Sequence, residues 1–194
     1  MRDSGIPWLG EIPVHWEVKR LKWFATLQRG YDLPDYERIE GDFPVVTSGG
    51  IVATHNHSAV EGPGVVTGRY GSTGNVFYVE SDYWPHNTAL FVKNFHRNES
   101  RFVFFVMQTL NYGAHSSKSA VPGVDRKDLH EIIVAVPLPG EQKKIVEFIH
   151  TEDSKIEVFI TSLERQIALL QEYRASLIHE CVTGQRTVPE SCAP

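Results

Sequence analysis

The sequence predicts an α+β fold, in which a domain built on a mixed sheet is followed by one long coiled-coil helix. Up to residue 139 the chain alternates short apolar runs with Gly, Pro, Asn and Ser, a pattern typical of strands and turns. From residue 141 to residue 183 there is no Gly or Pro, and apolar residues recur every seven positions, which indicates a coiled-coil helix. We therefore expect three parts, with bounds at residues 1–139, 140–184 and 185–194.

The strands of the domain are predicted from short runs rich in β-branched and aromatic residues, each bounded by turn residues. These runs lie at residues 44–47, 64–68, 76–79 and 89–92. Residues 16–21 are expected to form an early strand or another short leading element, and residues 132–136 a buried strand closed by the segment 137–140. Residues 101–110 have the length and composition of a helix. Strands mixed with a few helices are typical of an α+β domain.

The predicted long helix carries two apolar rows. One row is Ile149, Ile156, Leu163, Leu170 and Leu177, and the other, offset by four, is Ile160, Ile167, Arg174 and Cys181. The helix would be roughly 60 Å long, too long to bury its stripe against a domain of this size. We expect it to pair with a second copy of the chain, although a helix folded along its own domain is the alternative. The expected dimer interface comprises Ile149, Ile156, Ile160, Leu163, Ile167, Leu170 and Leu177.

The charge pattern does not by itself favour nucleic-acid binding. The formal net charge is −5, whereas phosphate binding favours a basic surface. The acidic excess lies in residues 31–100 and 140–194, and the remaining segments are slightly basic. The two cysteines, Cys181 and Cys192, form no disulfide framework, and there is no targeting signal or bilayer-spanning apolar run. We therefore expect a cytoplasmic protein without a membrane partner.

The sequence contains no signature of a catalytic, metal or nucleotide site. His55 and His57 are two residues apart, but no His, Cys or Asp cluster nearby completes a tetrahedral zinc site. Residues 68–74 are rich in glycine but lack the lysine of a P-loop. Glu80 or Asp82 can be imagined beside His86, yet no motif places a nucleophile beside a base. We expect no catalytic residue, no metal and no cofactor held by this chain.

Four motifs occur in the order found in one protein family. Residues 5–22 resemble the opening segment of a target-recognition domain, and residues 68–79 resemble its central hairpin. Residues 137–145 resemble the proline-rich start of its long helix, and residues 182–186 the end of that helix. On these residues the chain resembles one half of the specificity subunit of a Type I restriction-modification system. In that family two such halves follow in tandem, and two antiparallel helices hold two DNA-reading domains apart.

The resemblance implies a non-catalytic DNA-recognition subunit that directs a methyltransferase complex, with or without a restriction subunit, to double-stranded DNA. S-adenosylmethionine would belong to the partner methyltransferase. A homodimer would rebuild the two-domain layout, and its target would be a bipartite, interrupted palindrome. One alternative is a coiled-coil protein that competes with or modulates a full-length specificity subunit. Another is a carbohydrate- or peptide-binding domain on a stalk, which the motifs at the two ends of the helix disfavour.

The candidate DNA contacts are polar side chains on turns, together with cations near the start of the chain. Base readout needs hydrogen-bonding side chains near base edges, and backbone positioning needs cations, hydroxyls and amides near phosphates. Each of these segments is also compatible with an ordinary solvated loop. The residues with this chemistry are Lys19, Arg20, Ser48, His57, Arg69, Tyr70, Ser72, Thr73, Asn75, His86, Asn87, His115, Ser116, Ser117 and Lys118.

Overall fold

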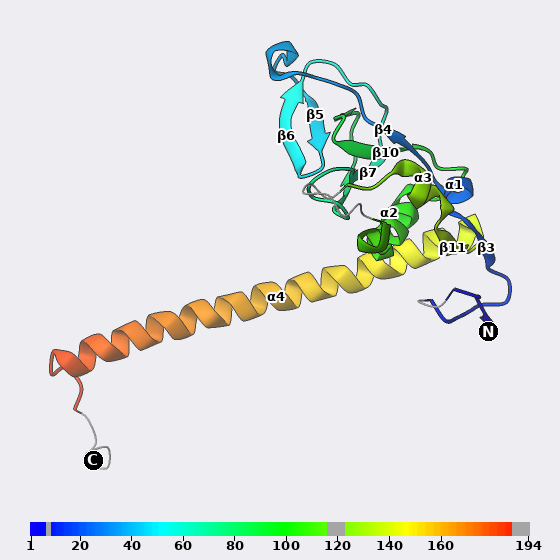
Figure 1. Cartoon of the computed structure of the whole chain (residues 1–194). Coiled ribbons are helices and arrows are strands. Elements are labelled where there is room, and N and C mark those ends of the chain that lie inside the picture. Colours follow the sequence, from blue (N-terminus) through cyan, green and yellow to red (C-terminus); the bar gives the residue numbers. More distant parts are fainter. Residues whose placement is uncertain (7–8, 116–122, 188–194) are drawn as a thin grey trace. The chain divides into compact units, whose positions relative to one another are not determined.

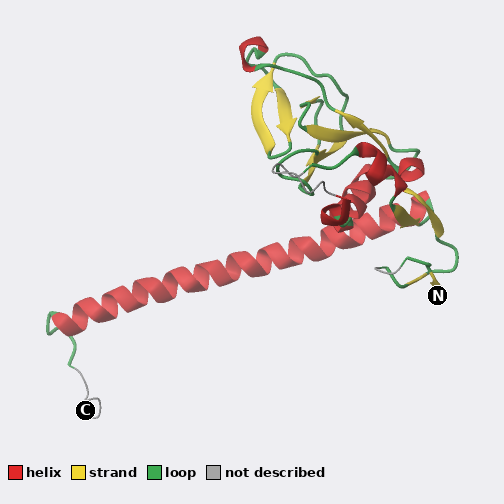
Figure 2. Ribbon diagram, viewed as in Figure 1, coloured by secondary structure: helices red, strands yellow, loops and turns green. Residues whose placement is uncertain are grey.

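The computed structural model describes residues 1–6, 9–115 and 123–187 (Figure 1). The chain divides into two compact units, Met1–Val146 and Glu147–Pro194. Figure 2 shows that the strands belong to the first unit, whereas the described part of the second unit consists mainly of helix. None of the described helices is both long and apolar enough to cross a membrane.

The first unit contains short strands and short helices. The strands are β1 (Arg2–Asp3), β2 (Glu11–Ile12), β3 (Glu17–Arg20), β4 (Thr26–Arg29), β5 (Phe43–Thr47), β6 (Gly50–His55), β7 (Gly64–Gly68), β8 (Val76–Val79), β9 (Trp84–Pro85), β10 (Ala89–Asn94) and β11 (Ile133–Val136). The helices are α1 (Leu21–Phe24), η1 (Asp35–Glu37), α2 (Ser100–Thr109), η2 (Tyr112–His115) and α3 (Arg126–Glu131). Helix α4 (Pro139–Val182) begins in this unit and continues through the second.

The strands form several small sheets. The largest sheet has the strand order β4-β10-β7-β8, and every pair of adjacent strands in it is antiparallel. A second sheet has the order β6-β5-β9, in which β5 is antiparallel to β6 and parallel to β9. Strand β11 pairs with β3, and β1 pairs with β2. This mixture of strand directions, followed by a long helix, confirms the predicted α+β fold class.

The four-stranded sheet is covered on both faces. Alternate residues of its strands point to opposite sides, and each side packs into a different buried cluster. Val65 and Leu90 belong to a buried cluster that includes residues of α1 and α2. The adjacent Val66 and Phe91 belong to a second cluster, which includes Val46 of β5. All four strand residues are no more than 2% exposed. The sheet is therefore a two-sided scaffold whose connecting loops can carry a binding surface.

The strands predicted at residues 44–47, 64–68, 76–79 and 89–92 are confirmed, as are the helix at 101–110 and the strand at 132–136. The early element at residues 16–21 is strand β3, which ends where α1 begins. His55 ends β6 and is buried, and its Nδ1 accepts a hydrogen bond from the Ile39 amide. Trp84 and Pro85 form β9, which pairs with β5.

The start of α4 is anchored within the first unit by Gln142, which is fully buried. Its Oε1 accepts from the Glu99 amide at 2.9 Å, and its Nε2 donates to Asn98 Oδ1 at 2.8 Å and to the Pro137 carbonyl at 2.9 Å. A buried amide is tolerated because these groups satisfy its hydrogen-bonding capacity. The neighbouring Glu141 accepts from Trp16 and His15, and these hydrogen bonds lower the pKa of its carboxyl group.

Most apolar residues of the two predicted rows are exposed in the single chain. Five of them are exposed by 41% to 66%: Ile156, Ile160, Leu163, Ile167 and Leu170. Ile149 and Leu177, at the ends of the first row, are half-buried. The helix ends at Val182, and Gly184 follows with a φ of +74°, the left-handed conformation with which many helices end. The predicted long helix is confirmed.

Candidate nucleic-acid interface

Three turns of the first unit meet at Thr88. The Thr88 carbonyl accepts hydrogen bonds from the amides of Arg69 at 2.9 Å and Tyr70 at 3.3 Å. Its side-chain Oγ1 accepts from the Ser48 amide at 3.4 Å and lies 3.2 Å from His86 Nδ1. We call Ser48, Arg69, Tyr70, His86 and Thr88 the Thr88 cluster. The structure therefore brings together four of the predicted contact residues, from the β5–β6 turn, the β7–β8 loop and the β9–β10 turn.

Glycines allow the β7–β8 loop to fold back against the β5–β6 turn. A Cβ atom on Gly68 would lie 2.0 Å from the Ser72 carbonyl oxygen and 3.3 Å from Ser48 Cβ, so a side chain does not fit there. Gly71 and Gly74 have φ values of +75° and +92°, which favour glycine. The predicted residues of this loop have different exposures: Ser72 and Asn75 are exposed, whereas Thr73 is half-buried.

Arg69 and Tyr70 form a stacked pair. The Arg69 Cζ atom lies 4.4 Å from the centroid of the Tyr70 ring, a cation–π distance. Tyr70 pairs with Gly123 in an isolated antiparallel bridge, and the Arg69 carbonyl accepts from the Val124 amide at 2.9 Å. With Asp125, these residues line an open cavity of about 200 Å³. A cation, an aromatic face and a carboxylate therefore share one opening.

His86 and Asn87 are tied to the core and to the loop that follows β4. The His86 amide donates to the Val46 carbonyl at 2.8 Å, and the Asn87 side chain donates to Asp32. Burial lowers the pKa of His86, and the charge of Arg38 lowers it further, although Asp32 acts in the opposite direction. At neutral pH the imidazole is therefore uncharged, so it offers one hydrogen-bond donor and one acceptor.

The predicted cations of β3 lie apart from the Thr88 cluster in the sheet arrangement, because β3 pairs with β11. Lys19 Nζ is 2.6 Å from Glu17, and Arg20 is 2.9 Å from Glu131. Such exposed ion pairs contribute little to stability. They nevertheless place a carboxylate beside each cation, which reduces its attraction for phosphate.

Of the other predicted residues, His57 is separated from the cluster. His57 is exposed and follows β6 at the end of the β5–β6 hairpin opposite Ser48. His115 lies in η2, and Ser116, Ser117 and Lys118 lie outside the described residues. Within the described ranges, no three His, Cys, Asp or Glu side chains form a group that could hold a metal ion.

Two residues of the interface were not among the predicted contacts. Thr88 lies in a polar segment between two strands, but its hydrogen bonds to the other two turns are tertiary contacts. Gly123 lies against Tyr70, a residue far away in the sequence, and no local pattern identifies it. A search for turn hydroxyls could have found Thr88, whereas Gly123 becomes apparent only in the folded domain.

The family model described as "Type I restriction modification DNA specificity domain" matches residues 13–167. The specificity subunit of the Type I restriction enzyme EcoDI from Escherichia coli is 22% identical over 178 residues, which are 92% of this chain and 40% of that protein. The description of the family concerns DNA specificity, which is a recognition role rather than a catalytic one.

Two solved structures share the fold at 15% identity. A structure reported for complex assembly and conformational transition of the type I R-M system has a TM-score of 0.74, covering 91% of this chain and 48% of that chain. The S subunit of the Type-I restriction-modification system from M. genitalium has a TM-score of 0.63, covering 90% and 48%. The chain spans about half the length of these relatives, or less. It belongs to the family of Type I restriction-modification DNA specificity domains.

Proposed function

We propose that this chain reads double-stranded DNA for a Type I methyltransferase complex and uses the Thr88 cluster as part of its binding surface. The family match over residues 13–167 carries the proposal. The cluster supports it, because a guanidinium, hydroxyls and a neutral imidazole are groups that hydrogen-bond to base edges and phosphates. The chain would contribute recognition only. A partner methyltransferase would bind S-adenosylmethionine, and the role of this chain is the same with or without a restriction subunit in the complex.

We further propose that two copies pair through the apolar rows of α4, with Ile149 and Leu177 at the two ends of the interface. The exposure of Leu163 and its neighbours supports this proposal, because these side chains lack cover in the single chain. Burying an exposed Leu or Ile contributes about 1.5–3 kcal/mol. A row of such residues on each copy would therefore provide a substantial driving force for pairing.

Two charged residues favour an antiparallel pair. Asp153 is four residues after Ile149 and therefore occupies the same row as Ile160 and Arg174. In a parallel pair in register, each charged residue would face its own copy. Asp153 and Arg174 lie almost equally far from Leu163, on opposite sides of it. An antiparallel pair centred near Leu163 would therefore bring Arg174 of one copy level with Asp153 of the other, and the opposite charges would attract.

A selection from random DNA duplexes tests this function. The purified chain, alone and with its cognate methyltransferase subunit, would be incubated with the duplexes at low salt, and the bound DNA would be sequenced. We expect two inverted half-sites separated by a fixed spacer, because a two-fold protein selects a two-fold target. No enrichment would contradict DNA reading. Enrichment of one undivided site would contradict the paired arrangement but not DNA reading.

The competing function is exchange of coiled-coil partners with a full-length specificity subunit. The net charge of −5 and the ion-paired cations of β3 favour it, because they reduce attraction to DNA. Mixing the chain with such a subunit and determining the masses of the complexes would test it. Mixed complexes, together with no DNA enrichment by the chain itself, would replace the DNA-reading proposal with this one.

A further inference from the structure

The guanidinium of Arg69 stacks on the Tyr70 ring and has no ion-pair partner among the described residues. We propose that it binds two neighbouring hydrogen-bond acceptors on DNA, and that Gly123 is the residue that positions it. This inference rests on the proposed DNA-reading function and identifies the group that makes the contact.

The backbone beneath Arg69 is fixed on both sides. Its amide donates to the Thr88 carbonyl at 2.9 Å, and its carbonyl accepts from the Val124 amide at 2.9 Å. The amide of Tyr70 donates to the same Thr88 carbonyl at 3.3 Å. Because the segment is bound to two other parts of the domain, the Arg69 side chain starts from a defined position. Preorganisation of this kind reduces the entropy lost on binding.

Gly123 determines where the Tyr70 ring lies. A Cβ atom on Gly123 would be 2.6 Å from Tyr70 Cδ1 and 2.7 Å from Cε1, so even a methyl group would force the ring to move. The Arg69 guanidinium stacks on this ring at 4.4 Å. A substitution at Gly123 would therefore displace the surface that supports Arg69, although Gly123 itself is buried and carries no binding group.

Arg101 provides an internal comparison for the charge of Arg69. It also stacks on a tyrosine, with its Cζ 3.8 Å from the centroid of the Tyr78 ring. However, an Arg101 nitrogen lies 2.5 Å from Glu80 Oε1, so that cation is already neutralised. Among the described residues, Arg69 has no carboxylate within ion-pair distance. The fork of Arg69 is thus available to an external acceptor.

A stacked and planar guanidinium matches a flat pair of acceptors. On DNA, this chemistry is provided by O6 and N7 of guanine in the major groove and by two oxygens of one phosphate. Lysine carries the same charge but lacks the planar fork. The two sources of the acceptor pair can be separated experimentally, because a guanine contact affects one base position whereas a phosphate contact affects all sequences alike.

The test measures dissociation constants of full-length variants for the selected duplex and for its single-base substitutions, over a series of salt concentrations. Arg69→Lys and Arg69→Ala should each weaken binding by about tenfold or more, the range of a lost bidentate contact. If the acceptor is guanine, the variants lose the preference for guanine at one base pair and keep the base preferences at the other positions. If it is phosphate, the loss is uniform, and for Arg69→Ala the salt dependence falls by about one unit of slope.

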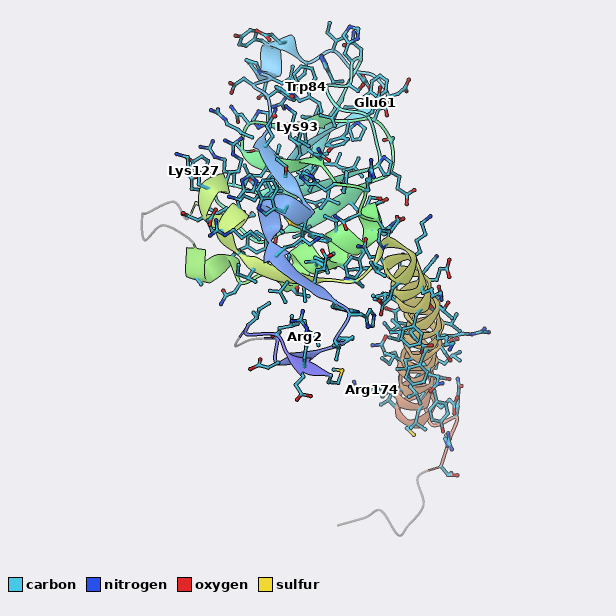
Figure 3. The ribbon with its side chains drawn as sticks, turned by 90° about the vertical axis from the view of Figure 1, so that its right-hand side faces the viewer. Arg2, Glu61, Trp84, Lys93, Lys127 and Arg174 are labelled. Atoms are coloured by element: carbon cyan, nitrogen blue, oxygen red, sulfur yellow. The ribbon has the colours of Figure 1, made fainter. Side chains whose placement is uncertain are left out.

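Gly123→Ala should weaken binding in the same way, and adding it to Arg69→Ala should cause little further loss, because both changes remove one contact. Arg101→Lys and Arg2→Ala are matched controls that should bind normally. Arg2 lies on β1, which pairs only with β2, and in Figure 3 it lies at the opposite end of the first unit from Trp84. If Gly123→Ala does not fold, judged by circular dichroism, Arg69→Lys decides the contact. Wild-type affinity and base preference in both Arg69 variants would overturn the inference, whereas absence of DNA binding by the wild type would overturn the proposed function.

Discussion

Leu27 in β4 and Leu170 in α4 are the same residue type in opposite surroundings, since Leu27 is 1% exposed and Leu170 is 66% exposed. The difference extends to the units that contain them. In the first unit, two buried clusters cover both faces of a sheet. In the second unit, the rows of α4 remain open to solvent. The first unit therefore has a core of its own, whereas the apolar residues of the second require a partner, so its association should depend on concentration.

The largest effect on pairing is expected when a charge is placed at Leu163, in the middle of an exposed apolar row of α4. Leu163→Asp should abolish pairing of the chain, because a buried and unpaired carboxylate costs on the order of several kcal/mol in each copy. The first unit should remain folded, since Leu163 belongs to the second unit. Sedimentation velocity would measure the mass, and near-UV circular dichroism would report on the core of the first unit.

Ser162→Asp is the matched control for this change, because it adds the same charge one residue away from the row. It should leave the dimer intact. A dimer of unchanged strength in Leu163→Asp would show that the proposed rows are not the interface, and a wild-type chain that is monomeric at high concentration would contradict pairing altogether.

The two leucines themselves give the next largest effect. Leu27→Ala should lower the free energy of unfolding of the first unit by about 2–5 kcal/mol, as expected when a buried leucine leaves a cavity. Leu170→Ala should leave that free energy unchanged and should instead weaken dimerisation. Urea unfolding and sedimentation equilibrium would measure the two quantities. Equal losses of first-unit stability in both variants would show that the open row is covered within the chain.

A smaller effect, limited to the first unit, is expected from pH. The Leu27 amide donates to His130 Nε2 at 2.9 Å, so the bond requires the unprotonated ring. Burial lowers the pKa of His130 below its ordinary value of 6.5, and Arg126 and Lys22 lower it further, while Glu131 opposes them. The unfolded chain therefore binds the proton more readily, and the stability from this group is complete above about pH 6.5 and decreases as the pH falls toward the folded-state pKa.

Urea unfolding at pH 7.5 and pH 5.5 would measure this change. His130→Gln removes the titrating group and should reduce the pH dependence of the unfolding free energy. His86→Gln is the necessary comparison, because burial lowers the pKa of His86 as well. An unchanged pH dependence in the His130 variant would contradict the role of this ring.

The sequence allowed prediction of the elements that local pattern determines. The heptad spacing and the absence of Gly and Pro predicted α4, and the apolar runs predicted β7, β8 and β10. It did not predict β4, β6 or β9, because these short strands contain polar or turn residues and depend on pairing with distant segments. Helices α1 and α3 were missed because each is too short for a helical period to be recognisable.

The candidate site shows the same division. The chemistry of Arg69, Tyr70 and His86 could be recognised in the sequence, because polar residues between strands are common in binding loops. Their meeting at Thr88 could not be predicted, since it depends on the relative positions of two sheets. The ion pair of Arg20 was also unpredictable, because its partner Glu131 comes from a distant part of the chain, whereas the partner of Lys19, Glu17, lies two residues away on the same strand.

The sharing of Thr88 by three turns limits how this domain can be re-engineered. Replacing the β7–β8 loop alone with a loop of another shape would leave the Thr88 carbonyl without the amides of Arg69 and Tyr70. Replacing the β9–β10 turn alone with a turn of another shape would displace the carbonyl that accepts from Arg69 and Tyr70, and losing Thr88 would remove the hydroxyl that accepts from Ser48. A transplant of binding properties would therefore have to carry the three turns together, as one interchangeable module with its own internal hydrogen bonds.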